Sequence, residues 1–136
     1  MTTNKIERPV EIVVIDCDNI SVVLTHIYFN KVLGDNQKIV HFTNYTEAYN
    51  YFINRKNAPP KIILLETITA QGQCFSFLYK YQYLKRNDFV YIISVSVYKS
   101  DINRCLAYKF VRRYITKPLK FENVLDIANE LKLIEE

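Results

Sequence analysis

Five short apolar runs alternate along the chain with longer stretches in which apolar residues recur every three or four positions. The short runs are rich in β-branched residues, which is typical of strands buried on both faces of a parallel sheet. They cover residues 10–15, 38–42, 61–66, 89–94 and 111–116. The longer stretches predict amphipathic helices at about 19–33, 45–57, 75–86, 100–108 and 121–134. Residues 67–73 are expected to form a loop.

A strand followed by a helix, five times over, predicts an α/β fold of the (βα)5 type. We expect a doubly wound, five-stranded parallel sheet with helices on both faces and the flavodoxin-like strand order 2-1-3-4-5. The chain has 136 residues, enough for one hydrophobic core but too few for two. We therefore expect a single domain over 10–136, preceded by a flexible polar lead-in over 1–9.

The charge pattern narrows the classes of partner. The net charge of +4 comes from 18 basic and 14 acidic residues, with no dense basic block, so nucleic-acid binding is not expected. No apolar run approaches the roughly 20 residues that span a bilayer, and the amino terminus lacks the apolar segment of a signal peptide. We expect no membrane association and a cytoplasmic location. The expected partner is another protein.

The cysteines suggest no metal centre. Cys17, Cys74 and Cys105 are far apart and form no metal-binding motif. An odd number of cysteines without a signal peptide favours reduced thiols. We expect Cys17 to be a buried, inert thiol, and Cys74 and Cys105 to belong to the core.

Polar residues collect where the predicted strands end. The carboxyl ends of parallel strands meet at one edge of the sheet, so these side chains should lie together. Carboxylates there can bind a divalent cation, while a hydroxyl and an ammonium group can bind phosphoryl oxygens. The residues are Asp16, Cys17 and Asp18 after the first strand, Glu66 at the end of the third, Ser94 and Ser96 at the fourth, and Lys117 after the fifth.

In these features the chain resembles the receiver domain of two-component response regulators, over about residues 10–135. The resemblance rests on the acids after the first strand, on Leu64-Leu65-Glu66, on Ser94, and on a motif from Tyr114 to Leu119 that contains Lys117-Pro118. It implies that Ser94 and Lys117 stand at phosphate-contacting positions, that Tyr114 is a switch residue, and that the peptide bond before Pro118 is cis.

The departures from the receiver pattern indicate an atypical, or pseudo-, receiver. Receivers are phosphorylated on an aspartate at the position of Glu66, and a second acid, a metal ligand, stands where this chain has Cys17. A neutral thiol is a poor ligand for a hard cation, so Asp16 and Glu66 should hold Mg²⁺ weakly at best, and no cofactor is expected. Lys109 replaces a usual glycine and should adopt a positive φ if the loop keeps the family's path.

The resemblance implies a stand-alone module of phosphorelay signal transduction that is not an enzyme. It would bind a histidine kinase or a downstream signalling protein through the face built from the fourth helix, fifth strand and fifth helix, independently of phosphorylation. A homodimer is a further possibility. We expect Glu66 to accept hydrogen bonds from both Lys117 and Ser94, with Tyr114 turned inward.

Two alternatives remain at this stage. The first is a phospho-accepting receiver that uses Asp16 or Asp18 with Mg²⁺. The second starts from Ile15-Asp16-Cys17-Asp18, which also resembles the Asp-x-Asp signature of haloacid-dehalogenase-type phosphatases. That family needs a further acidic motif after the lysine, and here only Glu122 and Asp126 follow, within a predicted helix.

Overall fold

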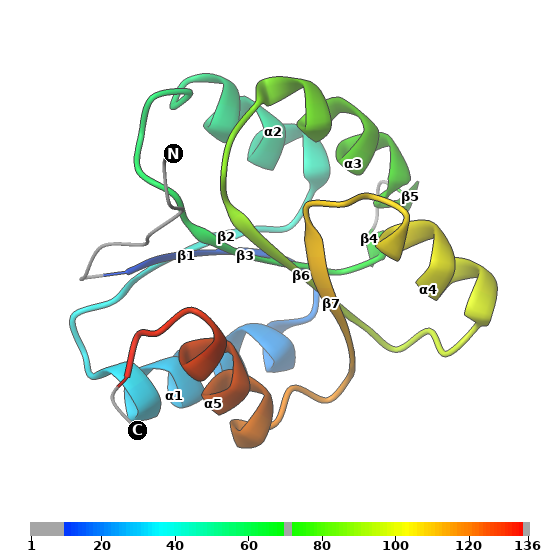
Figure 1. Cartoon of the computed structure of the whole chain (residues 1–136). Coiled ribbons are helices and arrows are strands. Elements are labelled where there is room, and N and C mark those ends of the chain that lie inside the picture. Colours follow the sequence, from blue (N-terminus) through cyan, green and yellow to red (C-terminus); the bar gives the residue numbers. More distant parts are fainter. Residues whose placement is uncertain (1–9, 70–71, 135–136) are drawn as a thin grey trace.

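The structure is a computed structural model that describes residues 10–69 and 72–134, so the predicted lead-in 1–9 lies outside the described residues (Figure 1). Its central sheet contains β1 (Glu11–Ile15), β2 (Lys38–Phe42), β3 (Ile62–Leu65), β6 (Phe89–Ser94) and β7 (Val111–Thr116). The strands are all parallel and lie in the order β2-β1-β3-β6-β7. Counted along the chain this is 2-1-3-4-5, which confirms the predicted fold class.

In the described residues five α-helices cover the sheet: α1 (Asn19–Leu33), α2 (Tyr45–Ile53), α3 (Phe75–Tyr81), α4 (Lys99–Leu106) and α5 (Phe121–Glu130). Four of them, α2, α3, α4 and α5, are shorter than predicted. A 3₁₀ turn, η1 (Gln82–Leu84), follows α3, and Lys85 then adopts a left-handed φ of 55°. Lys132, two residues beyond α5, has a φ of 57°. No helix in the described part of the chain is both long enough and apolar enough to cross a bilayer.

The expected loop after β3 contains a small hairpin. Strands β4 (Ile68–Thr69) and β5 (Gly72–Gln73) pair antiparallel, and the Cys74 N–H donates to the Thr67 carbonyl at 2.8 Å below them. The prediction of a plain loop was therefore wrong. Strands of two residues are too short to show an alternating pattern, so the sequence carries little signal for them.

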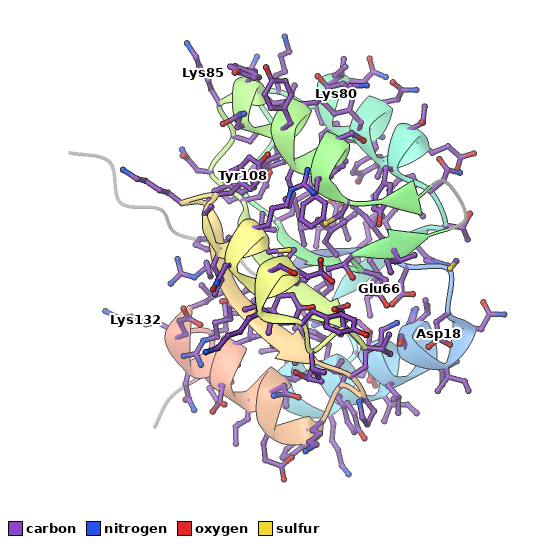
Figure 2. The ribbon with its side chains drawn as sticks, turned by 90° about the vertical axis from the view of Figure 1, so that its right-hand side faces the viewer. Asp18, Glu66, Lys80, Lys85, Tyr108 and Lys132 are labelled. Atoms are coloured by element: carbon purple, nitrogen blue, oxygen red, sulfur yellow. The ribbon has the colours of Figure 1, made fainter. Side chains whose placement is uncertain are left out.

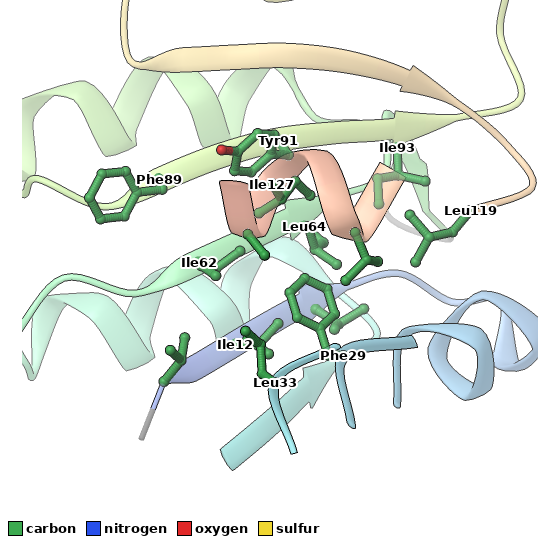
Figure 3. Close-up of a cluster of buried hydrophobic side chains, with 14 of the residues drawn as sticks. Ile12, Phe29, Leu33, Ile62, Leu64, Phe89, Tyr91, Ile93, Leu119 and Ile127 are labelled. Carbon is green, nitrogen blue, oxygen red and sulfur yellow. The ribbon is translucent and has the colours of Figure 1, made fainter. Parts of the chain in front are cut away.

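Two hydrophobic cores lie on opposite faces of the sheet. Helices α1 and α5 cover one face and α2, α3 and α4 the other (Figure 1). Alternate residues of β1 point to opposite cores: Ile12 belongs to the α1/α5 core shown in Figure 3, and Val13 to the other. Cys74 and Cys105 are both buried in the second core, as predicted. Burial on both faces explains why the central strands β1, β3 and β6 are nearly continuous apolar runs.

The connection from α4 to β7 departs from the expected path. Lys109 is not among the described residues with positive φ, so that prediction was wrong. The Val111 N–H donates to the Tyr108 carbonyl at 3.0 Å and closes a four-residue turn around Lys109 and Phe110. Such a turn can reverse the chain with right-handed residues alone, which removes the need for glycine.

Gly34 ends α1 in a conformation that side chains disfavour, with φ 88° and ψ 178°. We expect Gly34→Ala to lower the free energy of unfolding by about 1–3 kcal/mol, the usual cost of backbone strain in this region. The added Cβ would meet no atom within 4 Å, so the loss would report the backbone alone. Urea unfolding measures it. The exposed neighbour Asp35→Ala should change stability by less than about 0.5 kcal/mol, and an equally small change for Gly34→Ala would contradict the argument.

Candidate functional site

The predicted polar residues meet at the carboxyl edge of the sheet. Main-chain hydrogen bonds extend the strand pairing one step beyond the strands, from Asp16 N–H to the Phe42 carbonyl and from Glu66 N–H to the Ile15 carbonyl, both at 2.9 Å. The Lys117 N–H likewise donates to the Ser94 carbonyl at 2.8 Å. These bonds place Asp16, Glu66 and Lys117 at the same height along neighbouring strands of the sheet. In Figure 2 Glu66 and Asp18 lie close together at this edge.

Lys117 lies between the two buried acids. Its Nζ is 2.9 Å from Asp16 Oδ2 and 2.9 Å from Glu66 Oε1, and all three side chains are at most 7% exposed. The predicted Glu66–Lys117 pair is therefore present, and Asp16 joins it. Two carboxylates and one ammonium leave the buried cluster with a net charge of about −1, held where water cannot screen it well.

The surroundings shift the pKa values of Asp16 and Lys117. Burial raises the pKa of Asp16, although the hydrogen bond from Lys117 acts against this shift. For Lys117, burial acts to lower the pKa, but the hydrogen bonds to Asp16 and Glu66 outweigh it and the pKa is raised. Lys117 is therefore a permanent cation at neutral pH, held in place by the two acids.

The predicted hydrogen bond from Ser94 to Glu66 is not formed, because Thr67 lies between the two side chains. The Thr67 main-chain N–H donates to Glu66 Oε2 at 2.6 Å, and the Thr67 hydroxyl donates to the same oxygen at 3.3 Å. The Ser94 hydroxyl lies 2.5 Å from that of Thr67. A consistent chain of donors runs from Ser94 through Thr67 to the Glu66 carboxylate.

The chain of hydrogen bonds continues into the loop after β6. Ser94 Oγ accepts from the Ser96 N–H at 3.1 Å. The Ser96 carbonyl accepts from the Tyr114 hydroxyl at 2.8 Å, and the Ser96 hydroxyl donates to Asp101 of α4 at 2.7 Å. Tyr114 is half-buried against the α2/α3/α4 core, which is the inward placement that was expected. The loop therefore links the acidic cluster to both α4 and β7.

Asp18 lies beside the buried cluster as predicted, with its Oδ2 3.6 Å from Lys117 Nζ, whereas Cys17 does not join it. Asp18 is also the N-cap of α1: its Oδ1 accepts from the Ile20 N–H at 3.0 Å and its Oδ2 from the Ser21 hydroxyl at 3.1 Å. Burial acts to raise the pKa of Asp18, but these bonds and the nearby Lys117 together outweigh it and lower that pKa. Cys17 is exposed, so the prediction of a buried thiol was wrong. The Asp18 N–H donates to Asp16 Oδ1 at 2.9 Å, a tight turn that leaves the intervening residue facing solvent.

Several solved structures have the same architecture. A two-component response regulator from Cytophaga hutchinsonii matches with a TM-score of 0.76 and 21% identity, over 94% of this chain and 98% of that one. A response regulator from Clostridium difficile matches with a TM-score of 0.75 and 18% identity, over 90% and 95%. CheY from Borrelia burgdorferi, in a complex with CheX, BeF3 and magnesium, matches with a TM-score of 0.74 and 18% identity, over 90% and 89%.

The fold is that of a receiver domain. No family model matches the sequence, and no curated protein matches it either. At these identities the likeness shows the receiver fold alone, so the role of each site residue has to be argued from its contacts. One feature implied by the receiver resemblance is present in the backbone: the Lys117–Pro118 peptide bond is cis.

The residues at the edge do not fit the Mg²⁺ site that the receiver fold implies. Within residues 10–69 and 72–134, no three His, Cys, Asp or Glu side chains are grouped so that they could hold a metal ion. The two buried carboxylates, Asp16 and Glu66, both point at the Lys117 ammonium, and Cys17 faces solvent. A hard dication prefers several oxygen ligands, and here a lysine occupies the space between the two available ones.

Besides Thr67, two residues that contact the site were not predicted. His41 Nε2 lies 2.6 Å from the main-chain oxygen of Asp16, and since a carbonyl only accepts, this nitrogen carries the hydrogen. The Tyr45 hydroxyl donates to the main-chain oxygen of Glu66 at 2.7 Å. Both residues fix the backbone beside an acid. The parallel pairing of β2 with β1 was the available signal, because it brings the end of β2 next to Asp16.

Proposed function

We propose that this chain is an atypical receiver that signals through protein contacts without being phosphorylated. The proposal rests on Lys117, whose ammonium lies 2.9 Å from both the Asp16 and the Glu66 carboxylates. Glu66 stands at the position of the receiver phospho-acceptor and extends its charge by one methylene group toward that lysine. A permanent carboxylate there supplies the negative charge that a phosphoryl group supplies in other receivers.

The hydrogen bonds around Ser96 connect the Glu66 carboxylate to residues near the surface. Glu66 contacts Thr67, Thr67 contacts Ser94, and Ser94 accepts from Ser96, which contacts both Tyr114 and Asp101. Hydrogen bonds to charged groups contribute about 1.5–3 kcal/mol each. Two of them approach the ~5.5 kcal/mol that takes a two-state element from mostly one form to mostly the other. The Glu66 carboxylate can therefore hold α4 and β7 in one arrangement.

The output surface in this proposal is the groove between α4, β7 and α5. It encloses about 590 Å³, and its walls include the apolar Ile102 and Leu106 and the exposed cations Arg112 and Arg113. Glu130 pairs with both arginines, at 2.9 Å and 3.0 Å, so the groove keeps an excess of positive charge. We propose that a signalling protein, a histidine kinase or a downstream component, docks here with an acidic and apolar segment, in the cytoplasm.

The two alternative functions fit these contacts less well. Asp16 is held by Lys117 and by the Asp18 N–H, and Asp18 is occupied as the cap of α1. A nucleophilic or phospho-accepting aspartate needs a free carboxylate oxygen directed at the incoming phosphorus. Neither acid offers this together with a metal site, so we do not expect the chain to act as a phosphatase or as an acceptor on β1.

Intact-mass spectrometry after incubation with acetyl phosphate and Mg²⁺ tests the proposal, with an orthodox response regulator treated in parallel. We expect the control protein to gain the mass of one phosphoryl group and this chain to gain none. We also expect no hydrolysis of p-nitrophenyl phosphate. A phosphoryl group mapped to Asp16 or Asp18 would establish the first alternative. Hydrolysis that requires Mg²⁺ and is lost in Asp16→Asn would establish the phosphatase.

A further inference from the structure

A hollow of about 530 Å³ lies at the edge of the sheet opposite the acidic cluster. Its walls come from η1, from the end of α4 and from the turn before β7: Gln82, Arg104, Ala107, Tyr108, Lys109 and Phe110. Phe110 directly precedes β7, whereas Lys117 directly follows it, so the strand separates the two places. Figure 2 shows Tyr108 and Lys85 toward one edge and Glu66 and Asp18 toward the other. The volume lies within the ~300–1,000 Å³ of small-molecule sites.

The two cations of the hollow have no carboxylate partner. Within the described part of the chain, no ion pair involves Arg104 or Lys109, and both side chains are exposed. The guanidinium of Arg104 lies over the Phe75 ring, 3.8 Å from its centroid. This stacking orients Arg104 while leaving its N–H groups available, which suits a planar donor for a doubly charged anion.

The surrounding chain cannot neutralise these charges. Residues 67–116 contain eight basic and two acidic residues. Both acids already accept hydrogen bonds from other residues: Asp88 from Arg86 and from the Tyr81 hydroxyl, and Asp101 from the Ser96 hydroxyl. The mild net charge of +4 therefore hides a basic stretch of 50 residues, and no carboxylate lines the hollow to compete with an anion for its cations.

Aromatic rings form the firm wall of the hollow. The Tyr108 and Phe110 rings lie 5.6 Å apart, and Phe110 packs on Tyr81, with 5.0 Å between the centroids. Tyr81 is 2% exposed and belongs to the α2/α3/α4 core, so this wall is anchored in the core. A ligand ring can stack here without first ordering the side chains, which lowers the entropy lost on binding.

We propose that this hollow binds a small aromatic phosphomonoester, of the class that includes nucleoside monophosphates. The ring lies against Tyr108 and Phe110, and the phosphate dianion bonds to Arg104 and Lys109, matching two charges with two. The amide of Gln82 is placed to hydrogen-bond the polar edge of the ring. The site is independent of the proposed signalling role, because it shares no residue with the acidic cluster or with the groove between α4, β7 and α5.

Titrations followed by amide NMR test the site, using adenosine monophosphate, phenyl phosphate, adenosine and inorganic phosphate as separate probes. We expect both phosphomonoesters to bind and to shift signals of residues 82 and 104–110. Adenosine and inorganic phosphate should each bind at least about tenfold more weakly, since each lacks one of the two interactions. Inorganic phosphate that binds as tightly as the esters would overturn the aromatic part of the proposal.

Charge variants separate this site from general attraction to a basic surface. Lys109→Glu and Arg104→Gln should each weaken adenosine monophosphate binding by at least about tenfold. Lys31→Glu is the matched control: it makes the same change in net charge on an exposed residue of α1, across the sheet, and should leave binding unchanged. The amide spectrum of each variant reports whether it is folded. Equal weakening by Lys31→Glu and Lys109→Glu, or shifts centred on Ser94 and Lys117, would overturn the proposal.

Discussion

Replacing Lys117 by methionine should lower the free energy of unfolding by about 3–5 kcal/mol, the usual result of removing one partner from a buried ion pair. Asp16 and Glu66 would remain buried, with like charges directed at the space that the ammonium filled. Urea unfolding followed by circular dichroism at neutral pH measures the loss. Lys31→Met, on the exposed surface of α1, should change stability by less than about 0.5 kcal/mol.

The same variant should regain stability as the pH falls. Burial already raises the pKa of Asp16, and the hydrogen bond from Lys117 opposes this, so loss of Lys117 raises that pKa further. A carboxyl with a raised pKa binds protons more tightly in the folded state than in the unfolded one. Its contribution is therefore lost as the pH rises through the folded pKa and is restored below it. The deficit of Lys117→Met should be smaller at about pH 4 than at about pH 7.

A double-mutant cycle makes this prediction sharper. Glu66→Gln in the Lys117→Met background removes one of the two buried carboxylates that no longer have an ammonium partner. The double variant should therefore lose less free energy of unfolding than the two single variants lose in sum. Additive losses, or a deficit of Lys117→Met that does not change with pH, would show that the three side chains are not coupled as their 2.9 Å contacts imply.

The strands could be predicted from the sequence because burial in the sheet requires apolar residues. A residue such as Ile12 or Val13 is buried whichever face it points to, so each of the three central strands, β1, β3 and β6, is a nearly continuous apolar run. Helix ends were less predictable. Lys85 and Lys132 adopt left-handed φ values that glycine usually supplies, and nothing in the residue type announces this. The turn at Lys109 was missed for the opposite reason, because a right-handed turn needs no special residue.

The part of the site that depends only on the strand order was predictable. Parallel strands bring their carboxyl ends to one edge, and long side chains such as Glu66 and Lys117 meet there in any arrangement of the loops. Contacts that depend on a local turn were missed. Thr67 lies between Glu66 and Ser94 because its own main-chain N–H bonds the glutamate, and Cys17 faces solvent because the Asp18 N–H bonds Asp16.

Restoring both departures at once, in Cys17→Asp/Glu66→Asp, should turn a chain that does not accept a phosphoryl group into one that does. The shorter acid at 66 withdraws its carboxylate from Lys117 and opens the space that a phosphoryl group needs. The new acid at 17 starts from the solvent-facing position of Cys17 and turns toward Asp16 when a dication binds, and hard dications bind more tightly as carboxylate ligands are added. Mg²⁺ affinity should rise at least about tenfold, equivalent to about 1.4 kcal/mol.

Acetyl phosphate treatment with intact-mass detection, together with Mg²⁺ titration, reads both effects. Cys17→Asp alone should improve Mg²⁺ binding without creating an acceptor, and Cys17→Ser, which adds no charge, should improve it little.

The double variant also tests the role of Glu66. If its carboxylate stands in for a phosphoryl group, the unphosphorylated double variant should change the NMR signals of Tyr114 and Ser96, and phosphorylation should return them toward those of the original chain. Signals that stay the same in both forms would leave Glu66 as a lost acceptor with no influence on α4 or β7, because the hydrogen bonds through Thr67 and Ser94 would then carry no change to the surface.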